Sequence, residues 1–128
     1  MESKTIFQKL VDRELPSSVV WEDDSVFAFH DISKQAPVHV LIVPKKVIPR
    51  IAQASEQDAL LLGQLLLTAQ KVARQLGLEE TGYRIVINNG ADGGETVPHL
   101  HLHLLGGRPL SWPPVKNSSI TSGLETSQ

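Results

Sequence analysis

A run of seven residues, His99 to Leu105, alternates histidine with leucine and constrains the fold more than any other stretch of the chain. Because successive side chains of a β-strand point to opposite faces, this pattern predicts a strand with three histidines on one face and leucines facing a core on the other. Adjacent histidines of such a row lie roughly 6.6 to 7 Å apart at Cα, given the usual rise of a strand. That spacing lets their imidazoles surround one small anionic group.

The other periodic stretches predict one α+β domain built on a mostly antiparallel, five-stranded sheet. The apolar stripe that follows Ser55 is typical of a helix, with a capping box from Ser55 to Asp58 and a stop at Gly77. An earlier helix has Ser3 available as its cap and ends before Pro16. In chain order, we expect helix 3–13, strands 18–21, 26–30 and 38–43, helix 55–76, and strands 83–88 and 99–105. We assign residues 1–112 to the domain and the mostly polar residues 113–128 to a flexible tail.

Composition excludes several classes of function. The chain has 128 residues, 41% of them hydrophobic and 20% charged, which fits one soluble globular domain. Its formal net charge of −2 gives no electrostatic basis for general binding to nucleic acid or to an anionic membrane. It contains no cysteine, so disulfides, thiolate metal sites and cysteine nucleophiles are excluded. Because it shows neither a signal-peptide core nor a run of roughly 20 apolar residues, we expect a cytoplasmic protein.

The spacing of the histidines alone leaves three interpretations open. They could be solvent-facing residues of an amphipathic strand, or they could be zinc ligands, with Asp92 or Glu95 as a further ligand. The third interpretation is a phosphate-binding group. Polar residues outside the row, Asn88, Asn89 and His39, could converge on it.

The glycine-rich turn over residues 89–94 favours the phosphate. Gly90, Gly93 and Gly94 permit positive φ and close approach of the backbone, so the amides that follow them can face an anion. A histidine beside such a site can act as a nucleophile on phosphorus and divide a difficult hydrolysis into two steps through a covalent intermediate. Neighbouring hydrogen-bond donors would stabilise the charge on the transferring phosphoryl oxygens.

The pattern His-φ-His-φ-His-φ-φ, where φ is an apolar residue, matches every position from His99 to Leu105. It resembles the signature of the histidine triad, or HIT, superfamily, and the similarity extends from about residue 4 to residue 114. The chain looks most like the branch called histidine triad nucleotide-binding proteins, or Hint. The other shared motifs are Thr5-Ile6-Phe7, Glu22-Asp23-Asp24, Ala28-Phe29-His30-Asp31-Ile32, Gln35-Ala36-Pro37-Val38-His39, Ile42-Val43-Pro44-Lys45-Lys46, Asp92-Gly93-Gly94, Leu105-Gly106-Gly107-Arg108 and Trp112-Pro113-Pro114.

The resemblance implies a HIT-like fold and a homodimer whose protomer sheets join into one continuous sheet. It implies hydrolysis of purine nucleoside phosphoramidates, such as adenosine 5′-monophosphoramidate, to the nucleoside monophosphate and an amine. No cofactor is required, and neither nucleic acid nor a membrane is an expected partner. Sister branches cleave dinucleoside polyphosphates or transfer nucleotides. The alternative of another class is a nucleotide-binding interaction module whose turnover is incidental.

Carried over residue by residue, the resemblance makes His101 the nucleophile that forms a nucleotidyl-histidine intermediate. His103 and His99 would contact the phosphate and support its charge. His39 would lie behind them and support the histidine cluster. Thr96 keeps a hydroxyl that can deliver a proton to the leaving amine.

The resemblance also implies how the nucleotide is held. Asp31 would accept hydrogen bonds from the ribose hydroxyls, and Asn88 would bond the phosphate or sugar side of the ligand. Trp112 would lie near the active site of the partner protomer and influence the choice of leaving group. The residues expected to line the phosphate site are Gly94, Glu95, Thr96 and Val97. The apolar residues expected to sandwich the purine are Ile6, Phe7, Leu10, Phe29, Ile32 and Leu41.

The chain departs from the family pattern beside the triad. Glu95 stands where the family usually has glutamine, and it would bring a negative charge towards an anionic phosphate unless it points away or is protonated. Thr96 replaces a common serine and keeps the hydroxyl. Pro98 removes one backbone donor just before the triad, and Val47 occupies a position often held by histidine. None of these departures alters the triad itself.

Overall fold

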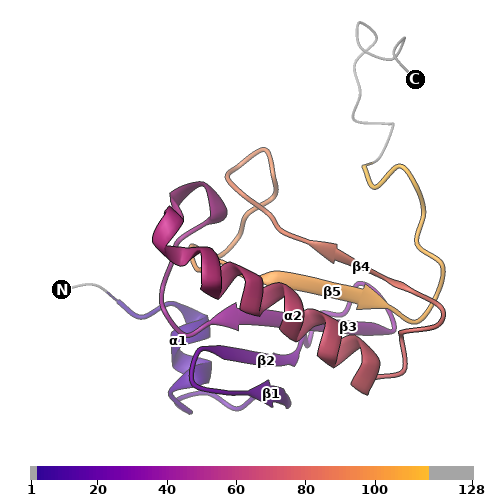
Figure 1. The fold of residues 1–128 in the computed structure, drawn as a ribbon, viewed down its shortest axis with the longest axis horizontal. Coiled ribbons are helices and arrows are strands. Elements are labelled where there is room, and N and C mark those ends of the chain that lie inside the picture. Colours follow the sequence, from indigo (N-terminus) through magenta and orange to yellow (C-terminus); the bar gives the residue numbers. More distant parts are fainter. Residues whose placement is uncertain (1–2, 116–128) are drawn as a thin grey trace, which may run out of the picture.

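The computed structural model describes residues 3–115, which form a five-stranded antiparallel sheet and two α-helices (Figure 1). This confirms the predicted α+β fold class. Residues 116–128, which make up most of the expected C-terminal tail, lie outside the described part of the chain. The first three residues of that tail, Pro113 to Val115, are exposed. Neither α-helix in residues 3–115 is long and apolar enough to cross a membrane.

The sheet has the strand order β1-β2-β3-β5-β4, so the last strand of the chain lies between β3 and β4. The central place of β5 brings the histidine run to the middle of the sheet. In chain order, the elements are α1 (Ile6–Val11), β1 (Val19–Glu22), β2 (Val26–His30), β3 (Val38–Pro44), the 3₁₀ turns η1 (Ile51–Gln53) and η2 (Glu56–Asp58), α2 (Ala59–Gln75), β4 (Tyr83–Val86) and β5 (Leu102–Gly106).

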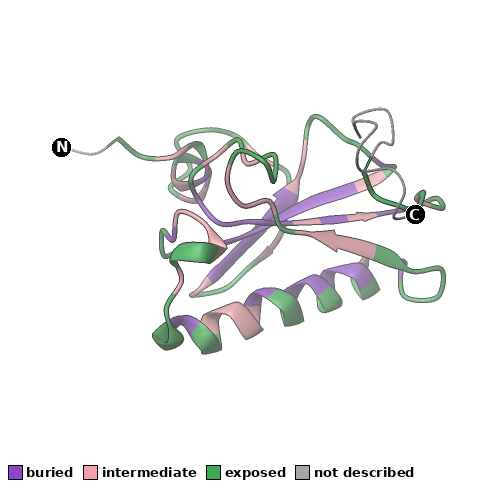
Figure 2. Ribbon diagram, turned by 90° about the horizontal axis from the view of Figure 1, so that it is seen from above, coloured by how far each residue is buried: buried purple, intermediate pink, exposed green. Residues whose placement is uncertain are grey.

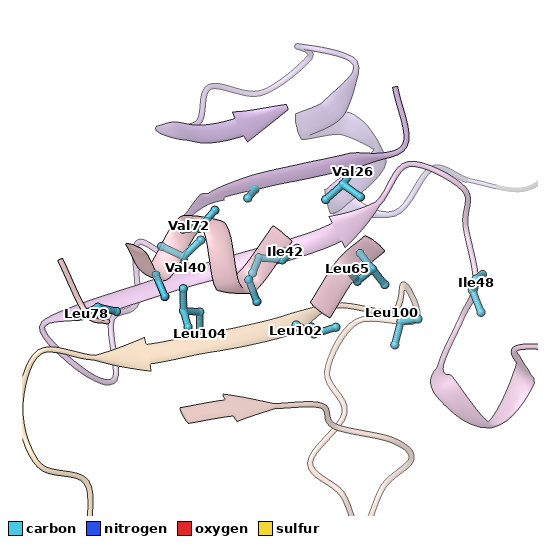
Figure 3. Close-up of a cluster of buried hydrophobic side chains, with 13 residues drawn as sticks. Val26, Val40, Ile42, Ile48, Leu65, Val72, Leu78, Leu100, Leu102 and Leu104 are labelled. Carbon is cyan, nitrogen blue, oxygen red and sulfur yellow. The ribbon is translucent and has the colours of Figure 1, made fainter. Parts of the chain in front are cut away.

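The face of the sheet that packs against α2 holds the main hydrophobic core (Figure 3). The buried side of α2 is turned towards the sheet and its exposed side away from it (Figure 2). Leu100, Leu102 and Leu104 lie in this core, and none is more than 2% exposed. Burial of each leucine contributes about 1.5 to 3 kcal/mol. The leucines therefore fix the run in place with its histidines turned to the opposite face, as the alternation predicts.

The opposite face of the sheet carries a second apolar cluster, against which α1 packs Phe7 and Leu10. Phe29 of β2 pairs with Leu41 of β3, and Leu41 pairs with His103 of β5. Because residues opposite one another in a sheet point to the same face, these three side chains form one row across it. The apolar floor of this face thus leads directly to the histidines.

The expected helix over 3–13 is wrong at both ends, since α1 covers only Ile6 to Val11. Thr5 rather than Ser3 is its cap. The Thr5 hydroxyl accepts a hydrogen bond from the Gln8 amide at 3.1 Å, and the Gln8 side chain accepts one from the Thr5 amide at 2.7 Å. This reciprocal pair is a capping box, which satisfies two amides that the first turn leaves without partners.

The predicted capping box from Ser55 to Asp58 is confirmed, but it opens the turn η2, and α2 itself begins at Ala59. The last two strands are shorter than expected. β4 ends at Val86 instead of residue 88, and β5 begins at Leu102 instead of residue 99. The late start of β5 has a cause that is distant in the chain. The amide of Leu100 donates to the carbonyl of Ile48 at 2.7 Å, outside the ladder between the strands.

Candidate active site

His101 is buried and has one ring nitrogen committed to the backbone. Its Nδ1 lies 2.7 Å from the carbonyl oxygen of His99. Because a carbonyl can only accept, Nδ1 carries the proton and donates it, and the lone pair of the neutral ring is left on Nε2. Burial lowers the pKa of His101, against the opposing charges of Glu95 and Asp31, so the ring is neutral at neutral pH. The arrangement presents an unprotonated imidazole nitrogen.

His103 and His39 are joined by a hydrogen bond whose direction the backbone fixes. The amide of Gln35 donates to Nδ1 of His39 at 3.0 Å, so the proton of His39 is on Nε2. That Nε2–H lies 2.9 Å from Nδ1 of His103 and donates to it. The remaining proton of the His103 ring is therefore on Nε2, where it can be donated to a ligand. Burial, followed by the neighbouring His101 and His39, lowers the pKa of His103 to about 4.

Asp31 connects this pair of histidines to the surface of the site. Its Oδ2 lies 3.4 Å from Nε2 of His39, and its Oδ1 accepts a hydrogen bond from the Ser33 amide at 2.8 Å. Burial lowers the pKa of His39, and the negative charge of Asp31 opposes that effect. Asp31 is partly exposed, so its carboxylate can still accept hydrogen bonds from a ligand.

His99 is fully buried, and protein atoms occupy both of its ring nitrogens. Its Nε2 donates to the carbonyl of Pro44, and its Nδ1 accepts from the hydroxyl of Thr5, both at 2.8 Å. With no nitrogen left for a ligand, His99 cannot contact the phosphate in the way the sequence led us to expect. It holds the carbonyl that orients His101, and its hydrogen bond from Thr5 ties the start of α1 to the triad.

A cavity of about 630 Å³ opens beside the histidines on the face covered by α1. Phe7 lines it, and the Phe7 ring also lies edge-on to His101 with the ring centres 4.8 Å apart. The seven residues expected around the purine and the ribose all line this cavity: Ile6, Phe7, Leu10, Phe29, Asp31, Ile32 and Leu41. Ile32 is 99% exposed, so it forms the rim of the cavity rather than its floor.

Sequence reasoning missed six further residues of the cavity lining. One signal was available, because the hairpin of the first two strands brings Ser18 beside His30, whose amide donates to the Ser18 carbonyl at 3.0 Å. His30, which has no role among the expected site residues, also lines the cavity. The missed residues are Leu15, Pro16, Ser17, Ser18, His30 and Lys34.

The glycine-rich turn folds tightly next to the triad. A Cβ on Gly93 would lie 2.4 Å from the carbonyl oxygen of Asn89, so only glycine fits there. Gly94 has a φ of 80°, in the left-handed region that favours glycine. The Asn88 side chain donates to the Gly93 carbonyl at 2.7 Å and thereby holds the turn. Asn89 does not join the histidines, because its side chain accepts from the amide of Ala52 at 2.8 Å.

Beyond the turn, the two residues expected to line the phosphate site differ in their exposure. Thr96 is exposed, so its hydroxyl is open to a ligand. Val97 is partly buried and packs against the apolar cluster of Phe7 and Phe29. The chain therefore reaches His99 from the rim of the site inwards.

Glu95, one of the residues that depart from the family pattern, is ionised and paired. Its two carboxylate oxygens accept hydrogen bonds from Nε and Nη2 of Arg50 at 2.8 and 2.9 Å, and Oε1 also accepts from the Gly90 amide at 2.7 Å. These contacts, with Arg50 the largest cause, lower the pKa of Glu95 to about 2. Arg50 was not expected at the site, because nothing local to the sequence links residues that lie 45 positions apart.

Asp31, His39 and His103 are the group of described residues whose side chains come close enough to hold a metal ion. Their potential ligand atoms all lie within 4.8 Å of one another. The hydrogen bonding does not suit a resident metal. A histidine that binds metal through Nε2 must carry its proton on Nδ1, and Nδ1 of His39 already accepts from the Gln35 amide. Binding of zinc would require that hydrogen bond to break.

Trp112 lies away from the cavity. The residue is 79% exposed, and the guanidinium of Arg84 lies 5.8 Å from the centre of its ring. The contribution expected of Trp112 concerns the active site of a partner protomer, which a single chain does not contain.

Comparison with known proteins identifies the class to which this site belongs. Residues 12–110 match the family described as HIT domain. A HIT-like protein of Synechocystis sp., called uncharacterised, is 55% identical over 114 residues, which are 89% of this chain and 99% of that protein. A 14 kDa zinc-binding protein of Zea mays is 51% identical over 115 residues, 88% of this chain and 89% of that protein. The chain therefore belongs to the HIT domain family.

The fold agrees with this assignment. The crystal structure of a HIT family hydrolase from Legionella pneumophila superposes on the chain with a TM-score of 0.85 at 47% sequence identity. The match covers 88% of this chain and 100% of the Legionella chain.

Proposed function

We propose that this HIT protein hydrolyses purine nucleoside phosphoramidates and that His101 is its nucleophile. One observation carries the proposal. The Nδ1 proton of His101 is committed to the His99 carbonyl, so the lone pair of Nε2 is available to attack phosphorus. The name of the Legionella neighbour, a HIT family hydrolase, supports hydrolysis as the type of reaction. The phosphorus–nitrogen bond as the target rests on the motifs that resemble the Hint branch.

In the first step, Nε2 of His101 forms a bond to phosphorus while the bond from phosphorus to the amine nitrogen breaks. The electron pair of the broken bond stays on the amine, which takes up a proton from the hydroxyl of Thr96. In the second step, water attacks phosphorus and the bond to His101 breaks. One proton of the water returns to Thr96, so the products are the nucleoside monophosphate and the free amine.

His103 would stabilise the charge on the phosphoryl oxygens during both steps. Its Nε2–H is the donor left free by the hydrogen bond from His39, and a preorganised donor of this kind acts strongly where water is excluded. Asp31 keeps an acceptor for the ribose hydroxyls and also lies beside His39. The ribose and the phosphate would thus be held by connected groups.

The cavity lined by Phe29, Leu41 and the α1 residues would take the purine. Its lining is mainly apolar, which suits the face of a base, and Asp31 lies at its edge, where the sugar would pass from base to phosphate. The chemistry of the cavity therefore orders the ligand with the base beneath α1 and the phosphate towards His101.

We also propose that the protein acts as a homodimer. β4 forms one edge of the sheet and Leu66 and Leu67 of α2 are about half exposed, so a second copy could cover these surfaces. In such a dimer, Trp112 would approach the active site of the partner and influence the choice of leaving group.

The reaction as proposed uses no metal. The relative from Zea mays is named a zinc-binding protein, and the residues that could hold an ion here are Asp31, His39 and His103. The hydrogen bond from Gln35 to His39 opposes that role, and the steps above use only His101, Thr96 and His103.

A panel of substrates tests the proposal. We expect the protein to hydrolyse a fluorogenic adenosine phosphoramidate faster than diadenosine polyphosphate by at least about tenfold, with the rate unchanged in the presence of a chelator. Faster cleavage of the polyphosphate would move the assignment to a sister branch of the superfamily. Tight binding of AMP without turnover of either substrate would indicate an interaction module, and loss of activity in the chelator would contradict the metal-free mechanism.

A further inference from the structure

The pairing of Arg50 with Glu95 has a geometry that a loose surface contact lacks. The guanidinium donates to both carboxylate oxygens, at 2.8 and 2.9 Å, and the Glu95 side chain is only 10% exposed. The carboxylate also accepts from the Gly90 amide at 2.7 Å, while Nη1 of Arg50 donates to the Gln53 side chain. Arginine is suited to such two-point contacts because its planar group presents parallel donors.

This ion pair joins two segments that are distant in the chain. The side chain of Asn89 accepts from the Ala52 amide at 2.8 Å, and the Leu100 amide donates to the Ile48 carbonyl at 2.7 Å. The segment 48–53 therefore contacts the first residue of the glycine-rich turn, Asn89, and the residue that follows the turn, Glu95. It also contacts Leu100, directly before His101. Thr96 follows Glu95 directly, so the pair also fixes the approach of the chain to the triad.

We propose that Arg50 and Glu95 form a positioning pair, which holds the glycine-rich turn against His101 and cancels the charge that Glu95 would otherwise present to the phosphate. The proposal deepens the proposed function and relies on it for its catalytic readout. Arg50 is needed because position 95 carries an acid, whereas a chain with glutamine at that position has no charge to neutralise.

The charges around His101 give this pair an effect that a purely structural contact would not have. The charged groups that act on His101 are Glu95 and Asp31, and the neighbouring His101 in turn lowers the pKa of His99 and of His103. Glu95 raises the pKa of His101 against the lowering effect of burial. Arg50 affects the pKa of His101 indirectly, because it neutralises the charge of Glu95.

A double-mutant cycle tests the pair through catalysis. We expect Arg50→Gln to lower kcat/KM for adenosine phosphoramidate about tenfold, because it leaves a carboxylate without its partner beside the phosphate. Glu95→Gln is expected to cost about two- to threefold. The double variant Arg50→Gln/Glu95→Gln should recover to within about threefold of wild type. Arg74→Gln, which breaks the exposed pair of Arg74 with Glu79, is the matched control and should have no effect.

The pH dependence of kcat/KM distinguishes an electrostatic effect of the Arg50–Glu95 pair from a purely structural one. The nucleophile must be neutral, so activity falls as pH drops through the pKa of His101. Arg50→Gln adds net negative charge near His101 and should raise that pKa, whereas Glu95→Gln leaves a positive charge and should lower it. The acidic limb of the pH profile of kcat/KM should therefore lie at the highest pH in Arg50→Gln and at the lowest pH in Glu95→Gln. Wild type and the double variant should lie between them.

Binding of AMP, measured by calorimetry, keeps this test apart from that of the proposed function. If wild type hydrolyses no phosphoramidate, the proposed function fails, but Arg50→Gln should still weaken AMP binding and the double variant should still restore it. The pairing is overturned if Arg50→Gln binds AMP and turns over substrate like wild type. It is equally overturned if the double variant is as defective as Arg50→Gln at an unchanged melting temperature.

Discussion

Replacement of His101 by alanine is expected to lower the turnover of adenosine phosphoramidate by roughly 10³-fold or more, the scale seen when an enzyme loses its nucleophile. The fold and the affinity for AMP should remain close to wild type, because the cavity for the nucleoside is built by other residues. The measurement is kcat on the fluorogenic substrate, together with calorimetric binding of AMP and the melting temperature.

His101→Asn is the sharper form of this experiment. An asparagine amide can take the place of Nδ1–H and keep the hydrogen bond to the His99 carbonyl, but it offers no nucleophile in the place of Nε2. It should be as inactive as His101→Ala and at least as stable. Turnover near the wild-type level in either variant would rule out His101 as the attacking group.

The second large effect is expected at His103. In His103→Asn, the side-chain oxygen can still accept from His39, but the donor to the phosphoryl oxygens is lost, so kcat should fall about 10² to 10³-fold. In His103→Gln, the amide nitrogen approximates the position of Nε2 and restores a donor, so the loss should be smaller, about tenfold.

The order of these two His103 variants carries the argument. A larger loss in His103→Gln than in His103→Asn would mean that the hydrogen bond with His39 matters more than the donor to the phosphate. The assignment of the Nε2 proton to the ligand side would then be wrong. Affinity for AMP and the melting temperature of each variant separate such an effect from unfolding.

Local periodicity explains why much of the fold could be predicted. Alternation placed Leu100, Leu102 and Leu104 in the core and the histidines on the other face, and the capping box at Ser55 lies where it was expected. These features depend on neighbours within a few residues. The start of β5 was missed because it depends on hydrogen bonds such as that from Leu100 to Ile48, which join residues far apart in the chain. The start of α1 was missed although its capping box, Thr5 to Gln8, is a local pattern, because Ser3 was expected to be the cap.

The candidate site likewise has features that could be predicted from the sequence and features that depend on long-range contacts. The resemblance to the family brought together the residues of the cavity and the histidines. It could not give the tautomer of His101, which the His99 carbonyl decides, nor the enclosure of His99 between Thr5 and Pro44. From the sequence alone, the charge of Glu95 could be kept from the phosphate in two ways: the side chain points away, or it is protonated. Its partner Arg50 provides a third, since the carboxylate stays ionised and is neutralised by pairing.

The central claim, attack on phosphorus by Nε2 of His101, is tested most directly by a search for the covalent intermediate. Wild-type protein should be mixed with a slowly hydrolysed adenosine phosphoramidate, quenched under alkaline conditions that preserve phosphorus–nitrogen bonds to histidine, and digested for mass spectrometry. We predict an adenylyl group on the peptide that contains His101, located on that residue and absent from His101→Asn. Steady turnover without any adenylylated peptide, or with the adenylyl group on His99 or His103, would contradict the mechanism.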